Sequence, residues 1–213
     1  MLSNNEIKEK TNIILNHFKV GNFENVISLS NKLLKELPNH EYLLNMIGMS
    51  HHRLNQLEKA EDIFVKAINR NKANVILRLN YSMVLKSQER ISDAIQELEN
   101  IIEREPNYIP AINNLANLKK DNGEFNDAIE LFKKLINLNP KIATPHYNLS
   151  VCYQQIREKE KSIKHAKLAS DLDENLTISD QTISMLTNYK TNDSINHFKK
   201  INDKINSNKI KQE

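Results

Sequence analysis

The feature that most constrains this chain is a set of small and large apolar residues that recurs at one fixed interval. The frames follow one another without insertion or deletion and are 7–40, 41–74, 75–108, 109–142 and 143–176. A small residue stands early in the second half of every frame: Val26, Ala60, Ala94, Ala128 and Ser162. This agreement indicates a repeat array, in which each unit buries its apolar face against its neighbours.

The fourth frame shows the local structure of one unit most clearly. Ile112, Leu115 and Ala116 have the i, i+3, i+4 spacing that predicts one apolar face of a helix. Gly123 then ends this helix, because glycine adopts the left-handed backbone conformation without strain. A second helix follows and ends before Pro140, which cannot continue helical hydrogen bonding. The frame therefore predicts two short helices joined by a tight turn.

This frame resembles a tetratricopeptide repeat, the helix–turn–helix unit of 34 residues. The residues that carry the resemblance are Asn114-Leu115-Ala116, Gly123-Glu124-Phe125, Asp127-Ala128-Ile129, Phe132 and Pro140. The family's aromatic residue in the first helix is missing, and Ile112 stands in its place. The resemblance implies an all-α fold, a right-handed superhelical α-solenoid of tetratricopeptide helix–turn–helix repeats.

The frames also divide the chain into segments. We expect an N-terminal lead-in over residues 1–6 and five tetratricopeptide repeats over 7–176. Apolar residues at helical spacing predict degenerate capping helices over 177–205, which would cover the last exposed apolar seam. The polar residues 206–213 predict a disordered tail.

Composition and charge narrow the class of protein. The chain has 3 Gly and 5 Pro, a low content that favours helices with short connections. Its net charge of +3 arises within residues 199–213, so residues 1–198 carry no net charge, which argues against nucleic-acid binding. Cys152 is the single cysteine and reads as a small core residue, which fits a reducing compartment and a cytoplasmic location. No apolar run is long enough to predict a membrane span.

The usual signatures of catalysis and metal binding are missing from the sequence. There is no glycine-rich phosphate loop, no His-Glu-x-x-His run and no cysteine pair, so we expect no catalytic residue, cofactor or metal site. His17 and His51 occupy the same place in their frames, and His52 adjoins them. Ordinary half-buried histidines are the main interpretation of this group, and a metal site is the alternative.

The resemblance implies that the first helices of successive repeats line a concave surface along which ligands lie. Carried over by position, the predicted binding residues are Asn12, Tyr42, Asn45, Met49, Leu79, Asn80, Met83, Asn113, Asn114, Asn117, Tyr147 and Asn148. The methionine, leucine and tyrosine side chains favour an apolar or mixed partner segment, with partly buried packing between repeats as the alternative.

One column of this surface reads Asn12, Met46, Asn80, Asn114 and Asn148. A carboxamide donates and accepts at once, so a row of them can pair with the backbone of an extended peptide. The column resembles the asparagine ladder in the repeat domain of O-linked N-acetylglucosamine transferases. The alternative is that these side chains only form hydrogen bonds within the array.

The predicted function is a non-catalytic protein–protein interaction scaffold or adaptor that binds an extended peptide or partner segment in its concave groove. The alternative is the substrate-recruiting repeat segment of a larger glycosyltransferase or sulfotransferase whose catalytic domain is not in this chain. A third hypothesis is a homo-oligomer assembled through the terminal apolar helices.

Overall fold

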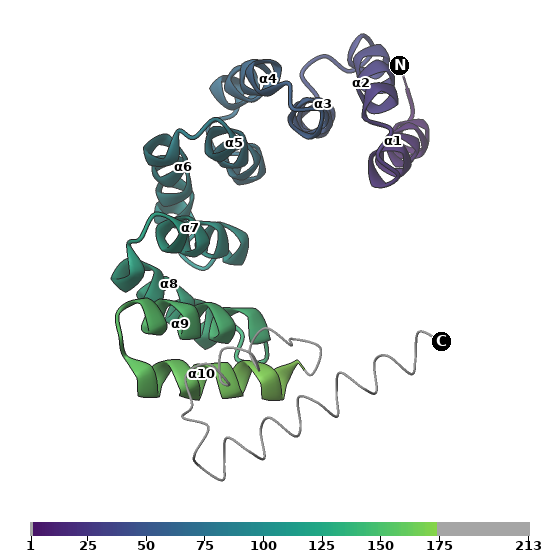
Figure 1. The fold of residues 1–213 in the computed structure, drawn as a ribbon. Coiled ribbons are helices and arrows are strands. Elements are labelled where there is room, and N and C mark those ends of the chain that lie inside the picture. The colour runs from purple at the N-terminus through teal and green to yellow at the C-terminus, as the bar shows by residue number, and fades with distance from the viewer. Residues whose placement is uncertain (1, 174–213) are drawn as a thin grey trace. The chain divides into compact units, whose positions relative to one another are not determined.

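The computed structural model describes residues 2–173, which contain ten α-helices and no strand (Figure 1). The helices are α1 (Asn4–Lys19), α2 (Phe23–Leu34), α3 (Glu41–Arg53), α4 (Leu57–Arg70), α5 (Val75–Ser87), α6 (Ile91–Arg104), α7 (Ile109–Asp121), α8 (Phe125–Leu138), α9 (Ala143–Gln155) and α10 (Lys159–Leu172). The capping helices expected over 177–205 and the tail expected over 206–213 lie outside the described residues.

The helices recur with the period of the sequence. Odd-numbered helices from α3 onward begin one frame apart, at Glu41, Val75, Ile109 and Ala143. Even-numbered helices do the same, at Phe23, Leu57, Ile91, Phe125 and Lys159. In the fourth frame Gly123 has a φ of 81° between the two helices, and α8 ends at Leu138, two residues before Pro140. Both turn predictions for this frame are therefore confirmed.

The first helix begins earlier than its frame. Helix α1 starts at Asn4 because Ser3 and Glu6 form a capping box. The Ser3 hydroxyl accepts a hydrogen bond from the Glu6 N–H at 3.3 Å, and the Glu6 carboxylate accepts one from the Ser3 N–H at 2.8 Å. Half of the expected lead-in over residues 1–6 is thus helical.

Two compact units divide the chain: Met1–Ala111 and a second unit that begins at Ile112. In the first unit each helix from α1 to α6 packs against the next, and the first helices α1, α3 and α5 also contact one another in sequence. In the second unit α8 packs against α9, and α9 packs against α10.

The small residues of the repeat are fully buried between packed helices. Val26, Ala60, Ala94, Ala128 and Ser162 are all 0% exposed. In the second pair the two helices approach closely at Gly48 of α3. A Cβ atom there would lie 2.7 Å from the ring of Phe64 on α4, which is itself fully buried. The absence of a side chain at Gly48 therefore allows the Phe64 ring to pack directly against the α3 backbone.

Candidate functional site

A hollow of about 470 Å³ lies on the first-helix surface of the first unit. Its lining residues are Asn4, Ile7, Lys8, Thr11, Asn12, Leu15, His40 and Tyr42. The α1 members follow one another at the three- and four-residue spacing of a single helix face. Tyr42 comes from the first turn of α3. Two of the predicted binding residues, Asn12 and Tyr42, are thereby brought to one place.

The hollow combines apolar walls with a few polar groups. Ile7 and Leu15 are half-buried and supply aliphatic surface, whereas the Asn12 carboxamide is exposed. Burial raises the pKa of the Tyr42 phenol, so its hydroxyl stays protonated and able to donate at neutral pH. Lys8, also in the lining, carries a positive charge at the exposed edge. This arrangement suits a segment that presents both an apolar side chain and backbone polar groups.

Asn45 and Asn80 bond to each other across the first unit. The Asn80 side-chain N–H donates to the Asn45 side-chain oxygen at 2.6 Å, which links α3 to α5. This bond is of the kind expected if the asparagines bond within the array. It uses one of the two N–H donors of Asn80, so the carboxamide retains capacity for a further partner. Other predicted binding residues on the same two helices are half-buried: Met49, Leu79 and Met83.

The histidines of α3 interact with neighbouring side chains of the array. His51 Nδ1 lies 2.7 Å from the Gln56 side-chain oxygen, and His52 Nε2 lies 2.8 Å from the Ser87 hydroxyl of α5. Burial, with a smaller effect from Arg53, lowers the pKa of His52 and keeps it neutral at pH 7. Within residues 2–173, no group of three or more His, Cys, Asp or Glu side chains is placed to hold a metal ion.

The second unit contains a compact cluster of Asn113, Asn117, Lys120 and Asn148. Lys120 Nζ donates to the side-chain oxygens of Asn148, at 3.0 Å, and of Asn117, at 3.3 Å. Asn148 donates to the same Asn117 oxygen at 3.3 Å, and Asn117 donates to the Asn113 backbone carbonyl at 2.9 Å. Asn148 is only 5% exposed, so this network mainly joins α7 to α9.

The position of Lys120 in its frame also predicts that it lines the surface of the first helices. Its spacing of three residues from Asn117 and seven from Asn113 places all three on one face of α7. The remaining predicted residues, Asn114 of α7 and Tyr147 of α9, are half-buried.

Cys152 of α9 is confirmed as a core residue. Its side chain is fully buried, and burial raises the pKa of the thiol to about 11. The thiolate form that nucleophilic chemistry requires is therefore scarce at neutral pH.

Comparison with known proteins agrees with this architecture. Family models described as tetratricopeptide repeat match residues 42–74 and 85–149. MamA residues 41 to the end from Desulfovibrio magneticus RS-1 superposes with a TM-score of 0.69 at 17% identity, over 79% of this chain and 96% of that chain. A MamA RS-1 ArsTM double mutant gives 0.71 at 18% identity, with the same coverage of 79% and 96%.

YrrB, described as a TPR protein with an unusual peptide-binding site, superposes with a TM-score of 0.64 at 20% identity. The match covers 80% of this chain and 88% of YrrB. These likenesses confirm the fold class, an all-α helical repeat solenoid. Among the described residues, no helix has the length and apolar character needed to cross a bilayer.

Proposed function

The chain is a tetratricopeptide repeat protein, and we propose that it is a non-catalytic protein-interaction scaffold that holds an extended partner segment on its α1–α3 surface. The observation that supports this proposal is the hollow lined by α1 and the start of α3. Among the predicted binding residues, Asn12 and Tyr42 line it together.

The chemistry of the hollow suggests how a segment would be held. An extended peptide leaves its backbone N–H and C=O groups unpaired, and the exposed Asn12 carboxamide can donate to one and accept from the other. The aliphatic surface of Ile7 and Leu15 can take up an apolar side chain of the partner, and the Tyr42 hydroxyl can donate beside it.

The binding surface would require little reorganisation on binding. Apart from His40, which directly precedes α3, its residues belong to two regular helices, so mainly the partner segment would lose conformational freedom. We expect a short segment to bind with micromolar affinity, about −8 kcal/mol. The peptide-binding site that is named for YrrB supports a similar role for this related fold.

The test is selection of short random peptides displayed on phage against the immobilised chain, followed by calorimetry of the selected peptides. Replacing Asn12 and Tyr42 together by alanine should weaken binding by about tenfold or more, a loss of at least about 1.4 kcal/mol. Asn12 is exposed, and Tyr42 is half-buried at the edge of the core, so we expect the helices to form and the circular dichroism spectrum to be retained.

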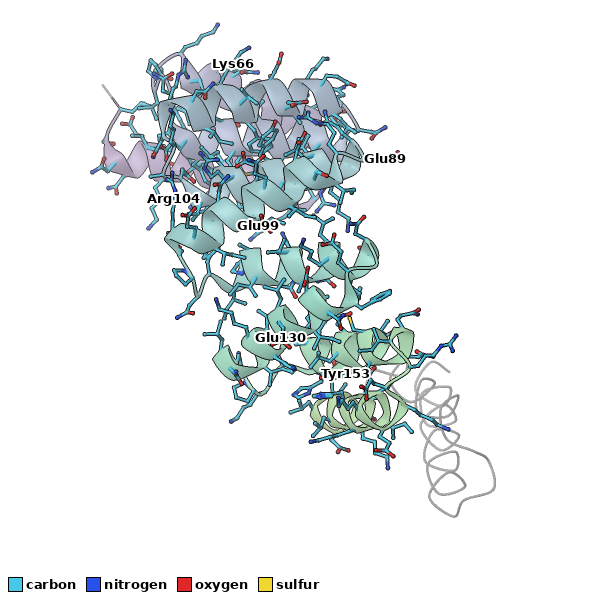
Figure 2. All side chains as sticks on the ribbon, turned by 90° about the vertical axis from the view of Figure 1, so that its left-hand side faces the viewer. Lys66, Glu89, Glu99, Arg104, Glu130 and Tyr153 are labelled. Atoms are coloured by element: carbon cyan, nitrogen blue, oxygen red, sulfur yellow. The ribbon has the colours of Figure 1, made fainter. Side chains whose placement is uncertain are left out.

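The control is a matched pair of substitutions on second helices of the same unit. Lys66→Ala on α4 and Glu99→Ala on α6 change exposed side chains that are outside the hollow (Figure 2). Affinity should be unchanged in this control. Equal binding by the Asn12 and Tyr42 double variant, or failure to select any peptide, would contradict the proposal.

A further inference from the structure

Two histidines of the last described helix pair face each other through ring nitrogens. His146 lies in the first turn of α9 and His165 in the middle of α10. Their Nδ1 atoms are 3.0 Å apart, which is hydrogen-bonding distance. His146 is only 7% exposed, so this contact is part of the packing between the two helices.

The two rings meet edge to edge. Their centroids are 5.3 Å apart, their planes differ by 24°, and the Nδ1 atoms are 3.0 Å apart. The centroid separation exceeds the Nδ1–Nδ1 separation by about twice the radius of an imidazole ring. Both Nδ1 atoms therefore lie near the line that joins the two centroids. The in-plane lone pair or N–H of each ring is therefore aimed at the other ring.

This geometry restricts the protonation of the pair. A hydrogen bond between the two Nδ1 atoms requires one to carry a proton and the other to accept it through its lone pair. A neutral pair can satisfy this requirement with one ring in each tautomer. A doubly protonated pair cannot, because two N–H groups would then face each other across the same contact, each on a positively charged ring.

Nearby lysines also oppose positive charge on His165. The ring of Tyr153 on α9, labelled in Figure 2, packs against His165 with the ring centroids 5.6 Å apart. Lys161 lies over the Tyr153 ring, and its charge is already paired with the Glu158 carboxylate at 3.4 Å. The charged groups that act on His165 are Lys164 of its own helix and Lys133 of α8.

Lys133 donates a hydrogen bond to the Glu130 carboxylate of the same helix at 2.7 Å. Among the described contacts, no carboxylate forms a hydrogen bond or ion pair with either histidine ring. An added proton on the pair would therefore have no direct counter-charge.

We propose that His146 and His165 form a proton-operated latch that holds α10 against α9 at neutral pH and releases it in mild acid. The latch makes the end of the described array an acid-sensitive part of the protein. Release would expose the apolar face of α9 that α10 covers, and so would change what this end of the array can bind.

The direction of the pH effect follows from the protons bound in each state. Burial lowers the pKa of both histidines in the folded protein. For His165, nearby His146, Lys164 and Lys133 add to this effect, and its pKa falls to about 4. An unfolded or detached histidine titrates near 6.5. The stabilisation is therefore present above about pH 6.5 and is lost as the pH falls towards 4, because the open state binds more protons. For each proton that is taken up on opening, the equilibrium constant for opening rises by up to about tenfold for every unit by which the pH falls.

The first measurement is a nitrogen NMR titration of the histidine side chains in the intact chain. We expect His165 to stay neutral at about pH 5, well below the usual histidine range, with one protonated and one bare Nδ1 in the pair. Hydrogen exchange of α10 amides should then show an opening equilibrium that rises by about tenfold or more between pH 6.5 and pH 5, after correction for intrinsic exchange.

The matched variants are His165→Phe and His17→Phe. Phenylalanine at 165 keeps an aromatic ring beside Tyr153 but cannot titrate, so the acid-induced opening of α10 should fall to the smaller part that His146 alone contributes. The same substitution at His17 of α1 should leave the acid-induced opening of α10 unchanged. Hydrogen exchange of α2 amides in the same sample provides an internal reference. Titration of His165 near 6.5, or acid opening of α10 that is as large in His165→Phe as in the unmodified protein, would overturn the latch.

Discussion

At the scale of single residues, one backbone conformation recurs in every frame. The residue between the two helices of each pair has a positive φ: Gly21 at 81°, Asn55 at 56°, Glu89 at 62°, Gly123 at 81° and Arg157 at 63°. This left-handed conformation ends the first helix and lets the chain turn into the second. Glycine adopts it freely and asparagine with little cost, whereas glutamate and arginine do so with steric strain.

Replacing Glu89 by glycine should therefore stabilise the first unit. Relief of the left-handed strain, about 1–2 kcal/mol, exceeds the greater loss of backbone freedom that glycine suffers on folding, and we expect a net gain of about 1 kcal/mol. The Glu89 side chain is exposed, so little packing is lost (Figure 2). Urea denaturation followed by circular dichroism measures the change.

Glu89→Ala provides the control, because it removes the same charge and keeps a Cβ atom at the strained position. It should give no comparable gain. A decrease in the unfolding free energy of Glu89→Gly would show that strain is not the dominant contribution at this turn.

At the scale of helices and loops, the connection after α4 differs from those after α6 and α8. Pro106 and Pro140 follow α6 and α8, but Lys72 stands at this place after α4. Polar contacts fix the loop instead. The Lys72 carbonyl accepts hydrogen bonds from Arg78 Nε and Arg104 Nη1, each at 3.0 Å.

The same loop is tied to α3 by a carboxylate. The side chains of Asn71 and Asn74 each donate to Glu41 at 2.6 Å, one to each carboxylate oxygen. Asn74 also caps α5, since its side-chain oxygen accepts from the N–H groups of Ile76 and Leu77 at 3.0 Å. The departure from proline in the second frame is thus accompanied by a side-chain network that holds the loop.

Lys72→Pro should be compatible with this loop and should stabilise it. The preceding residue, Asn71, has φ −132° and ψ 87°, close to Glu105 (φ −126°, ψ 80°) and Asn139 (φ −148°, ψ 93°), which precede the two prolines. Proline keeps the carbonyl acceptor and restricts the unfolded chain, so the unfolding free energy should rise by about 0.4–1 kcal/mol. The urea midpoint of the variant tests this expectation.

Lys72→Ala separates the effect of the proline ring from that of losing the lysine side chain. Only the proline variant should gain stability. A lower midpoint for Lys72→Pro than for Lys72→Ala would mean that the loop around residue 72 does not share the backbone geometry of the proline-containing loops.

At the scale of the whole molecule, the contacts of the first unit are between neighbouring helices and neighbouring repeats. Consecutive helices from α1 through α6 pack against one another, and their buried core residues run from Ile14 to Ile101. In an array of this kind, stability is close to a sum of repeat and nearest-neighbour contributions, and about three repeats are enough for independent folding.

A fragment of residues 1–108, which ends before α7, should therefore fold alone. It contains three complete helix pairs, and we expect a helical circular dichroism spectrum with a cooperative urea transition. A shorter fragment of residues 1–74, with two pairs, should unfold at a lower urea concentration because it lacks one interface. Non-cooperative unfolding of the longer fragment would contradict a self-sufficient first unit.

The sequence by itself determined the repeat length, the helix pairs and the family of this protein. These features follow from short-range rules: apolar spacing predicts a helix face, Gly123 predicts its end, and the buried column from Val26 to Ser162 predicts close helix approach. Such rules act within one unit and recur at a fixed interval, so each frame reinforces the next.

Only the tertiary structure decided which polar side chains meet. The sequence predicts that Asn80 and Asn148 share a surface, but their bonds to Asn45 and to Lys120 depend on how neighbouring helices are offset and rotated. The His146–His165 contact joins two helices in the same way and left no signal in either helix alone. Hydrogen bonds require atoms to be placed within a few tenths of an ångström, and packing between helices sets positions at that scale.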